Sequence, residues 1–515
     1  MNSSAKSQQT LSWFLLFSIG RICASTDAFW EPFQEIHGYC SDCNPTVPGS
    51  PDPLVAYTWP NSTKTSFVDP QLFRVTTDQF EFTPPACGTY HNSRSSASMI
   101  VVKSCPCSIR FDWSVEQAGW MEVSVATNQQ SNITLMGSLS EFNVPYPGKT
   151  RRMTYYPSAH AARKNDIYRL ETNPELYEGI RFTWLDVPAT TDDSLLPLEF
   201  SVTLVTKIKP LTYVGSYRSH PASLTRTWYT ATYSVRLNTE RERFNSVLVE
   251  RGDRVAIQGD GHPTIATALV AFRLNDLILN VIRNETDSAG NRSVVDDTIM
   301  AYPLYWIESV IEYWRATGDK TVAIGLLKDA RWIIDQRIAD FMDPDLDLVW
   351  MGWDDRLGNG WCGHAAGDDC GLEAHQTFAS LVIRVCQDVC RALHDVGMDA
   401  DADYYCRTAE NFGARFRSSF SSGSQGLRLH GVHSAANAIN AGLIKDEEMA
   451  KVVSDVLNNP ANICSESPFN QFWILQALGN IPDMERALAT IQLCWTPMVR
   501  NHAFEYYTNP SSDET

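Results

Sequence analysis

Two acidic residues in one irregular stretch of the chain have the types and spacing for acid–base chemistry. Asp253 and Asp260 lie seven positions apart, with Arg254 beside the first and an apolar segment between them. Hydrolysis of a glycosidic bond needs one carboxyl group that protonates the leaving oxygen and a second carboxylate opposite it. A carboxyl group near apolar residues has a raised pKa and can donate a proton at mild pH. By itself, the pattern also fits loop acids that are solvated or that cap a helix.

A cluster of tryptophans follows further along the chain, where helical periodicity is weak. Trp350, Trp353 and Trp361 surround Asp354 and Asp355. The face of an indole ring packs against the C–H face of a sugar and stabilises positive charge that develops there. Core packing is the alternative for these rings. We expect Trp353 or Trp361 to face a sugar pocket.

Helical periodicity begins near residue 218 and continues almost to the end of the chain. The candidate helices are 223–248, 262–283, 297–317, 321–341, 373–397, 399–420, 433–443, 446–458, 467–480 and 482–499. Their short connections predict antiparallel helical hairpins. We therefore expect an all-α domain over 218–515 of the (α/α)6 toroid kind. About ten helices are visible where six hairpins need twelve, so we expect this toroid to be incomplete at its C-terminal end.

Several large side chains on these predicted helices are expected to serve packing. Trp306, Trp314 and Trp332 lie within candidate helices and are predicted core residues. His262 and His433 begin candidate helices, where capping or ordinary packing is the expected role. None of the five is therefore assigned to chemistry.

Residues 71–207 show the alternation that is typical of strands. The β-rich runs are 98–102, 119–127, 132–139, 180–185 and 198–207, with turn residues between them. Alternation at Val123–Val125 and Phe200–Val205 fits strands with one buried face. We expect a β-sandwich domain over 71–207. An irregular Cys- and Pro-rich lead-in over 26–70 precedes it.

The N-terminus has the features of an export signal. A single lysine precedes an apolar stretch over 11–19, and a small-residue cleavage site follows at Ala24-Ser25. We predict a signal peptide over 1–25 and a secreted protein. Removal of Cys23 leaves an even number of the 13 cysteines, which favours disulfides over a metal site and leaves the pairing open. N-glycosylation sequons at Asn61, Asn132, Asn284 and Asn291 agree with export.

The overall charge limits the class of partner. The 515-residue chain has a formal net charge of −18. Such a surface repels phosphate backbones and anionic lipid, so we expect no nucleic acid partner and no membrane partner after signal cleavage. It also disfavours polyanionic substrates, unless a local basic pocket overrides the mean field.

The acidic stretch resembles a motif of the α-L-rhamnosidases, which are glycoside hydrolases of family 78. The run Arg251-Gly-Asp-Arg-Val-Ala-Ile-Gln-Gly-Asp260 is similar to the family's R-D-E-R-x-x-W-x-G-D block. Further segments match in the same order, and they are Tyr217–Tyr229, Tyr302–Trp306, Glu312–Asp319, Trp350–Asp355 and Trp495–Glu505. The resemblance covers roughly residues 200–505.

The resemblance implies an inverting α-L-rhamnosidase with a six-hairpin catalytic domain, no cofactor and no metal. Carried over from the family's block, Asp253 is the general acid and Asp260 binds substrate. The C-terminal segment supplies the base, which is Glu505 here. The remaining expected substrate-binding residues are Arg254, Trp353, Asp354 and Trp361. The implied partner is a carbohydrate, a terminal α-L-rhamnoside of a plant glycoside or a cell-wall polysaccharide.

Two alternatives stay open at this point. Ile257 and Phe504 stand where the family has Trp, which favours a sugar-binding relative without turnover. Another α/α-toroid glycosidase, such as a trehalase-like enzyme or a uronyl hydrolase, is the second alternative. A uronyl substrate needs a basic subsite, and near the candidate acids the sequence offers only Arg251 and Arg254.

Overall fold

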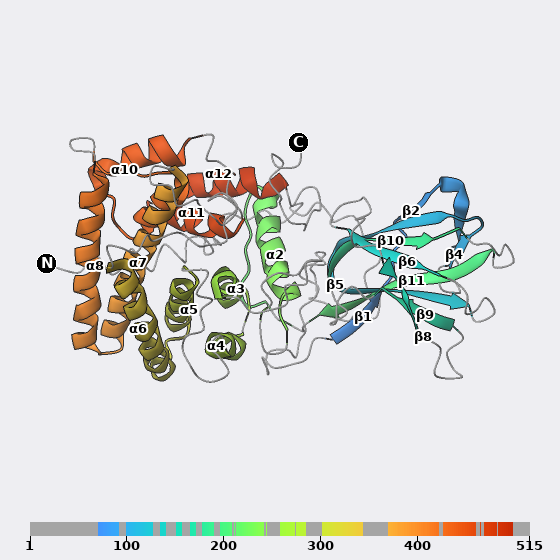
Figure 1. The fold of residues 1–515 in the computed structure, drawn as a ribbon, viewed down its shortest axis with the longest axis horizontal. Helices are drawn as coiled ribbons and strands as arrows, with labels where there is room; N and C mark the ends of the chain where they lie inside the picture. Colours follow the sequence, from blue (N-terminus) through green and yellow to red (C-terminus); the bar gives the residue numbers. More distant parts are fainter. Residues whose placement is uncertain are drawn as a thin grey trace.

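The chain folds into a part built from strands followed by a part built from helices, as the computed structural model shows (Figure 1). The structure describes residues 71–91, 99–126, 134–140, 151–156, 165–170, 178–189, 196–208, 211, 213–240, 244, 258–272, 274–284, 301–342, 369–421, 426–459, 464, 468–481 and 483–497. The two parts form two lobes and give the molecule an elongated outline. The predicted order of antiparallel strands and then helices is confirmed. The predicted signal peptide and lead-in lie outside the described residues.

The strands of the first part all pair in antiparallel fashion. They are β1 (Gln71–Val75), β2 (Phe80–Thr83), β3 (Gly88–His91), β4 (Met99–Val102), β5 (Cys107–Ala126), β6 (Met136–Ser140), β7 (Arg151–Arg152), β8 (Thr154–Tyr156), β9 (Asn165–Arg169), β10 (Glu178–Val187) and β11 (Leu198–Ile208). Along the main path the order is β3-β4-β11-β5-β10-β6-β7, while β1, β2, β8 and β9 pair beside it.

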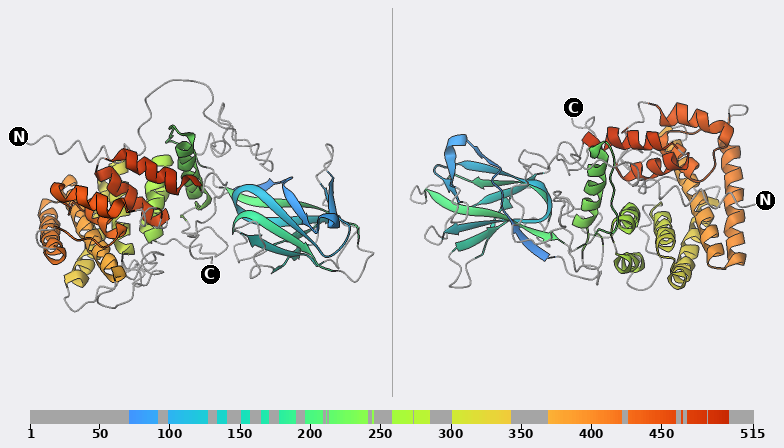
Figure 2. Two further views of the ribbon diagram at one scale, coloured as in Figure 1. Left: turned by 90° about the horizontal axis from the view of Figure 1, so that it is seen from above. Right: turned by 180° about the vertical axis from the view of Figure 1, so that it is seen from behind.

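Strand β5 pairs with four other strands along its length. Its first half pairs with β2 and β10, and its second half pairs with β9 and β11. The register between β10 and β5 shifts between Ile180 and Phe182, where the sheet bends. The strands therefore curve around one apolar core (Figure 2).

Alternation decides which strand side chains enter this core. Met121, Val123 and Val125 of β5 are buried within it, as are Phe200 and Leu204 of β11. The predicted period-2 pattern is confirmed on these strands. All five predicted β-rich runs coincide with described strands, namely β4, β5, β6, β10 and β11.

The second part consists of helices joined by connections. They are α2 (Ala222–Leu237), α3 (Gln258–Ala271), α4 (Asn275–Asn284), α5 (Tyr302–Thr317), α6 (Lys320–Met342), α7 (Asp369–Asp395), α8 (Asp399–Phe420), α9 (Val432–Asn440), α10 (Asp446–Val452), the π-helical turn η7 (Val453–Leu457), α11 (Pro468–Asn480) and α12 (Met484–Cys494).

Two predicted helices differ from the structure. The predicted helix 262–283 is divided into α3 and α4, because the backbone of Phe272 forms an isolated β-bridge with Tyr213. The predicted helix 223–248 ends at Leu237, because Thr239 leaves the helix and forms a bridge with Phe244. In both cases a contact with a residue outside the helix ends the helical hydrogen bonding.

Five helices form a closed cycle of contacts, which we call the inner ring. Helix α3 packs on α5, α5 on α7, α7 on α9, α9 on α11, and α11 returns to α3. The other helices pack on this ring: α2 contacts α3, α4 contacts α5, α6 contacts α5 and α7, α8 contacts α7, and α12 contacts α11. The helical part that the sequence predicts after residue 218 is confirmed.

The strand and helix parts share buried contacts where they meet. The hydroxyl of Tyr233 in α2 donates a hydrogen bond to the carbonyl oxygen of Glu116 in β5, at 2.7 Å. Ala118 of β5 and Leu211 belong to the helical core cluster, and Trp120 packs against it. The sheet therefore contributes apolar surface to the helical core.

Three disulfides lie in the described part of the chain. They join Cys87 to Cys107, Cys390 to Cys406, and Cys464 to Cys494. The Cys386-x3-Cys390 spacing is not a pair, because Cys390 bonds to the next helix and Cys386 is a buried thiol. The prediction that cysteines form disulfides is thus supported, and the pairing, which the sequence left open, is decided by helix packing. None of the described helices combines the length and apolarity needed to cross a membrane.

Candidate active site

The residues that the sequence predicts for the site fall almost entirely outside the described residues. Those outside are Asp253, Arg254, Trp353, Asp354, Trp361 and Glu505. Asp260 lies in the first turn of α3, where the backbone is described and the side chain is not. The roles of these residues stay predictions, and the described helices define the framework that adjoins them in the sequence.

The inner helices α5, α7 and α9 run in the same direction. In each neighbouring pair, a residue further along one helix contacts a residue further along the other. These contacts are Glu308–Arg384 and Arg315–Asp388 between α5 and α7, and Glu373–His433 and Gln387–Ala441 between α7 and α9. The N-terminal ends of these inner helices therefore lie at one end of the ring. That end is also where the chain enters α3, α7 and α9.

A close approach fixes the first turns of α3 and α5 against each other. A Cβ atom on Gly259 would lie 2.2 Å from the ring of Tyr302, so only glycine fits at this position. Tyr302 is itself buried at the start of α5. Because Asp260 follows Gly259 directly, this contact anchors its backbone.

Aromatic side chains of α3, α5 and α11 pack together in a layer next to this turn. His262 of α3, Tyr305 of α5 and three aromatic residues of α11 form it, which are Phe469, Phe472 and Trp473. The centroids of Tyr305 and Trp473 lie 4.5 Å apart, with the rings 23° from parallel. His262, which is buried in this layer, lies within one turn of Asp260 along α3.

His262 packs in this layer, as the sequence predicts, and lies inside α3 rather than at its first residue. Burial, with the charge of Arg384 as the next cause, lowers the pKa of His262 to about 3. The imidazole is therefore neutral at physiological pH. Its Nε2 lies 4.0 Å from Oε1 of Glu312, beyond hydrogen-bonding distance.

A cluster of charged side chains lies further along α5 and α7. Arg384 donates hydrogen bonds to Oε1 of Gln476 at 2.6 Å and to Oε2 of Glu308 at 3.4 Å. Its Nε lies 3.6 Å from Oδ2 of Asp388. Oδ1 of Asp388 accepts a hydrogen bond from Arg391 at 2.6 Å. The cluster thus ties α5, α7 and α11 together by polar contacts.

Burial and neighbouring charge set the protonation states in the cluster. Burial raises the pKa of Glu308 to about 8, although Arg384 opposes the shift. Burial would also raise the pKa of Asp388, but the guanidinium groups around it, Arg315 foremost, hold that pKa well below its usual range. Asp388 is therefore the charged partner of the arginines, and Glu308 is protonated at neutral pH.

The acids of α5 are enclosed and are not placed to act on a substrate. Glu308 is 0% exposed and Glu312 is 8% exposed. Burial raises the pKa of Glu312 as well. A raised pKa suits a general acid, but such an acid must also reach the leaving oxygen. We therefore read these acids as part of the framework.

This cluster is the main polar feature that sequence reasoning missed. A signal for it exists, because charged residues recur at i, i+4 and i+7 on otherwise apolar helices. They are Glu308, Glu312 and Arg315 on α5, and Arg384, Asp388 and Arg391 on α7. That spacing places the charges of each helix on one face, toward the other helix.

A carboxylate joins α7 to the start of α9. Oε1 of Glu373 accepts a hydrogen bond from the backbone N–H of His433 at 3.0 Å and lies 3.0 Å from its Nδ1. A Cβ on Gly431 would lie 2.1 Å from the carboxyl carbon of Glu373, and the φ of this glycine is 91°. His433 is thus buried at a capped helix start, in agreement with its predicted role.

The tryptophans predicted to lie in the core differ in their surroundings. Trp306 is buried and its Nε1 donates a hydrogen bond to the carbonyl of Ile282 at 2.9 Å. Trp314 is half-buried against the same core. Trp332 is 41% exposed, so the prediction is wrong for this residue. The reason is that α6 is an outer helix, whose Arg331 turns to α8 while the next residue turns to solvent.

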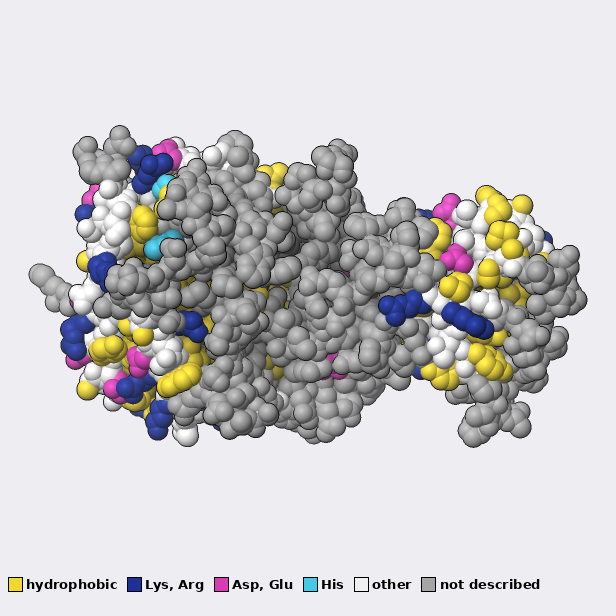
Figure 3. Space-filling model, viewed as in Figure 1, with side chains coloured by type: hydrophobic (Ala, Val, Ile, Leu, Met, Phe, Trp, Pro, Cys, Tyr) yellow, Lys and Arg dark blue, Asp and Glu magenta, His cyan; other side chains and the backbone are white. Residues whose placement is uncertain are grey.

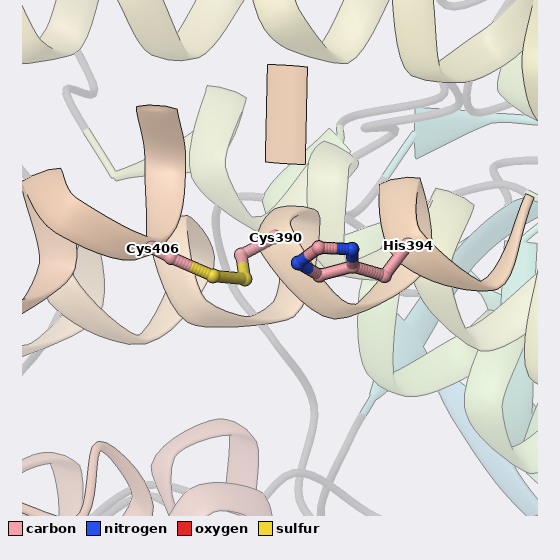
Figure 4. A group of neighbouring side chains, drawn as sticks. All are labelled: Cys390, His394 and Cys406. Carbon is pink, nitrogen blue, oxygen red and sulfur yellow. A yellow bond between two sulfur atoms is a disulfide. The ribbon is translucent and has the colours of Figure 1, made fainter. Parts of the chain in front are cut away.

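One group of residues with metal-binding side chains comes together in the described part of the chain (Figure 4). It contains Cys390, His394 and Cys406. The two sulfurs are joined in a disulfide, so neither is available as a thiolate ligand. Nδ1 of His394 lies 2.8 Å from Oδ1 of Asp399. The group is a disulfide beside a surface histidine.

Comparison with known proteins finds solved structures with a similar fold, and it finds no match by sequence. No protein-family model matches the chain, and no curated protein sequence matches it. A rhamnosidase from Klebsiella oxytoca, solved with rhamnose bound, has a TM-score of 0.64 and 14% identity, over 88% of this chain and 93% of that one. A family 78 rhamnosidase from Bacillus sp. GL1 has a TM-score of 0.60 and 16% identity.

The extent of these matches differs between relatives. The match to the Bacillus enzyme covers 83% of this chain and 44% of that chain. An α-L-rhamnosidase from Dictyoglumus thermophilum matches with a TM-score of 0.55 and 14% identity, over 85% of this chain and 48% of that one. The chain thus spans less than half of these two enzymes and nearly all of the Klebsiella protein. The fold of the chain is similar to that of α-L-rhamnosidases.

Proposed function

We propose that the chain is a glycoside hydrolase that removes terminal α-L-rhamnose units from glycosides or polysaccharides. One observation carries the proposal: a chain with the D-R-x-x-x-x-G-D remnant at Asp253–Asp260 has the fold of a rhamnosidase that was solved with rhamnose bound. Fold alone does not define an activity, so the acidic motif is the second requirement.

The arrangement of the inner helices supports this assignment. Asp253 and Arg254 precede the start of α3 at Gln258 by five and four residues, and Trp361 precedes the start of α7 at Asp369 by eight. Both helices belong to the inner ring, which lends support to a shared pocket at its N-terminal end. Glu505 follows α12, a helix that packs beside α11 and α2.

In the proposed mechanism the carboxyl group of Asp253 donates its proton to the glycosidic oxygen as the C1–O bond breaks. A water molecule attacks C1 from the opposite face and gives its proton to Glu505. Inversion requires the two carboxyl groups to stand roughly 6.5–9.5 Å apart. Arg254, Asp260 and Asp354 bind sugar hydroxyls, and Trp353 and Trp361 pack on the ring. The reaction proposed in this way uses neither cofactor nor metal.

The finer architecture belongs to the same proposal. We infer a β-sandwich over 71–207 and an (α/α)6 six-hairpin domain over 218–515, and the closed cycle of inner helices supports the second. We also infer a signal peptide over 1–25, a lead-in over 26–70 and a secreted, glycosylated protein. The three disulfides support an oxidising compartment.

The test is hydrolysis of an aryl α-L-rhamnoside by the purified chain, followed by NMR of the released sugar. The β-anomer should appear first if the mechanism inverts. On a rhamnoside with a poor leaving group, Asp253→Asn should lower kcat by about 10²- to 10⁴-fold, because it removes the proton donor. Asp395→Asn, an exposed acid at the end of α7, serves as the control. Unchanged activity in Asp253→Asn removes Asp253 from the mechanism.

The alternatives make different predictions in the same assay. A sugar-binding relative, favoured by Ile257 and Phe504, binds L-rhamnose and releases none from the aryl glycoside. Another α/α-toroid glycosidase hydrolyses a different aryl glycoside from the same panel. A panel of aryl glycosides, with rhamnose binding measured beside it, separates the three.

A further inference from the structure

A cavity of about 730 Å³ lies on the helical part, between the C-terminal end of α8, the segment 426–429 and the pair α10–η7. Its volume falls within the range of small-molecule sites. Basic and acidic side chains lie together on the surface at the α10 end of the helical part (Figure 3).

The carboxylate of Glu448 connects several of the segments that line this cavity through hydrogen bonds. Glu448 of α10 accepts two hydrogen bonds from the guanidinium group of Arg417 in α8, at 2.8 and 3.0 Å. It also accepts from the backbone N–H groups of Leu427 and Lys445, each at 3.1 Å. The hydrogen bonds from Arg417 are the main reason that the pKa of Glu448 falls to about 2. This carboxylate therefore stays ionised and hydrogen-bonded to residues that line the cavity.

Besides the Arg417–Glu448 pair, three basic and two acidic side chains line the cavity. Arg428, Lys445 and Lys451 are exposed and line it, against two exposed acids, Glu447 and Asp455. With the Arg417–Glu448 pair balanced, the lining is positive in a chain whose net charge is −18. A local positive site on an acidic protein is the exception that would admit an anionic ligand.

The inner ring holds the basic wall in place. Nε2 of Gln376 in α7 donates a hydrogen bond to the carbonyl of Arg428, and its Oε1 accepts one from the backbone N–H of His430, each at 2.8 Å. The backbone that carries Arg428 is thus fixed to the ring. On the other side, Asp455 and Val456 come from η7, and π-helical turns occur frequently at functional sites.

We propose that this cavity binds a carboxylate-bearing saccharide, such as a uronate unit. Arg428 and Lys445 bind the sugar carboxylate, because a guanidinium group and an ammonium group donate strong hydrogen bonds to it. Glu447 and Asp455 accept hydrogen bonds from hydroxyl groups. Leu429 and Val452 contact the C–H face of the ring. The saccharide part rests on the proposed function, and the carboxylate part rests on the cavity alone.

The experiment is ligand-observed NMR titration of the full chain with glucuronate, glucose and inorganic phosphate. We expect saturable binding of glucuronate, and affinities for glucose and phosphate at least about tenfold weaker. Arg428→Gln and Lys445→Gln should each weaken glucuronate binding by about tenfold, since each removes a charge-assisted hydrogen bond. Lys328→Gln, an exposed lysine on α6, is the matched control and should not change binding.

Three results overturn the inference: glucuronate fails to bind, phosphate binds as tightly as glucuronate, or both cavity variants bind like the wild type. Hydrolysis of the aryl α-L-rhamnoside is measured on the same preparations. A chain that binds glucuronate without hydrolysing the rhamnoside loses the proposed function and keeps this site. A chain that hydrolyses the rhamnoside and does not bind glucuronate keeps the proposed function and loses this site.

Discussion

The strand part and the helix part bury charge very differently. Among the described residues of the strands, Glu122 is the one buried charged side chain, and it lies on the face of β5 opposite the apolar core. In the helices, the buried carboxylates and guanidinium groups are Arg236, Glu308, Glu312, Glu373, Arg384 and Asp388. Five of these six lie on the inner helices α5 and α7, and Arg236 lies on α2.

The difference follows from geometry. In a strand, neighbouring side chains point to opposite faces, so Glu122 can leave the core while Met121 and Val123 enter it. An inner helix of a ring is surrounded on all sides, so its polar side chains have to find partners inside. Arg384 and Asp388 satisfy each other in this way. The helical part therefore buries paired charges together with its apolar core, whereas the strand part keeps its buried charge outside the apolar core.

The strongest test of this comparison removes the centre of the charged cluster. Arg384→Met should lower the free energy of unfolding by about 3–5 kcal/mol, because it leaves buried Asp388 without one of its partners and Gln476 without its donor. Urea denaturation measures the loss. Arg391→Gln is the control, because Arg391 contacts the same acid from a side chain that is 43% exposed. A loss below about 1 kcal/mol in Arg384→Met would show that the ring does not depend on its charges.

A second test compares covalent links in the two parts. Replacing Cys464 and Cys494 together by Ser should lower the free energy of unfolding by about 3.6 kcal/mol, because the pair closes a loop with a sequence separation of 30. The same change at Cys87 and Cys107, with a separation of 20, should cost about 0.4 kcal/mol less. Denaturation under non-reducing conditions gives both values. A much larger loss in the strand part would mean that lost packing, rather than loop entropy, dominates there.

A third test makes the corresponding change on the sheet. Arg169 donates to Oε1 of Glu122 at 2.9 Å, and Arg74 contacts the other oxygen at 2.6 Å. Arg169→Met should therefore cost about 2 kcal/mol, less than Arg384→Met, because Arg169 is 23% exposed whereas Arg384 is 5% exposed and also bonds to Gln476. Arg110→Met, whose partner Glu81 is largely exposed, is the control and should cost under about 1 kcal/mol. If Arg169→Met and Arg384→Met lowered the free energy of unfolding equally, the two parts would not differ in how much a buried charge pair contributes to stability.

The protonation of Glu308 gives a smaller, pH-dependent test. Because burial raises its pKa to about 8, the folded chain binds more protons than the unfolded chain between the usual carboxyl pKa of 4.5 and about 8. The stability contributed by this group is present below pH 4.5 and is lost as the pH rises through about 8. Glu308→Gln should cost about 1 kcal/mol near neutral pH and reduce this decline. Urea denaturation between pH 5 and 8 follows the slope.

A matched variant makes that pH test specific. Glu410 is an exposed acid on α8, so Glu410→Gln should keep the slope of the wild type. If Glu308→Gln keeps it too, Glu308 does not titrate in this range in the folded chain.

The smallest effect is expected on the outer surface of the ring. Trp332→Ser should change the free energy of unfolding by no more than about 0.5 kcal/mol, because the side chain is 41% exposed on an outer helix. Thermal denaturation of the variant measures it. A loss above about 1 kcal/mol would show that Trp332 contributes to a core after all.

Much of the local structure could be predicted from the sequence. The alternation at Val123–Val125 marked β5, and the same alternation at Cys107, Ile109, Phe111 and Trp113 went unrecognised although it belongs to the same strand. The positions of most helices followed the apolar period, but two predicted helices are interrupted where Phe272 and Thr239 form bridges with residues outside them. Local sequence patterns do not predict which distant residues will form such bridges.

The candidate site shows the same division. Asp253, Asp260 and Glu505 came from a motif, which sequence order preserves. The spacing of Glu308 and Arg315 on α5 indicated one charged face, but not which helix would meet it. Arg384 lies more than sixty positions later, and only the packing of α7 on α5 brings it within hydrogen-bonding distance.

The sequence by itself determined the periods of the strands and helices, the acidic motif, and the cysteines available for disulfides. The tertiary structure decided that Cys390 pairs with Cys406 rather than with nearby Cys386, that Trp332 faces solvent, and that Asp388 is ionised while Glu308 is not. The physical reason is that periodicity and composition act between neighbours in the chain. Burial, pairing and pKa depend on which distant residues share one enclosed space.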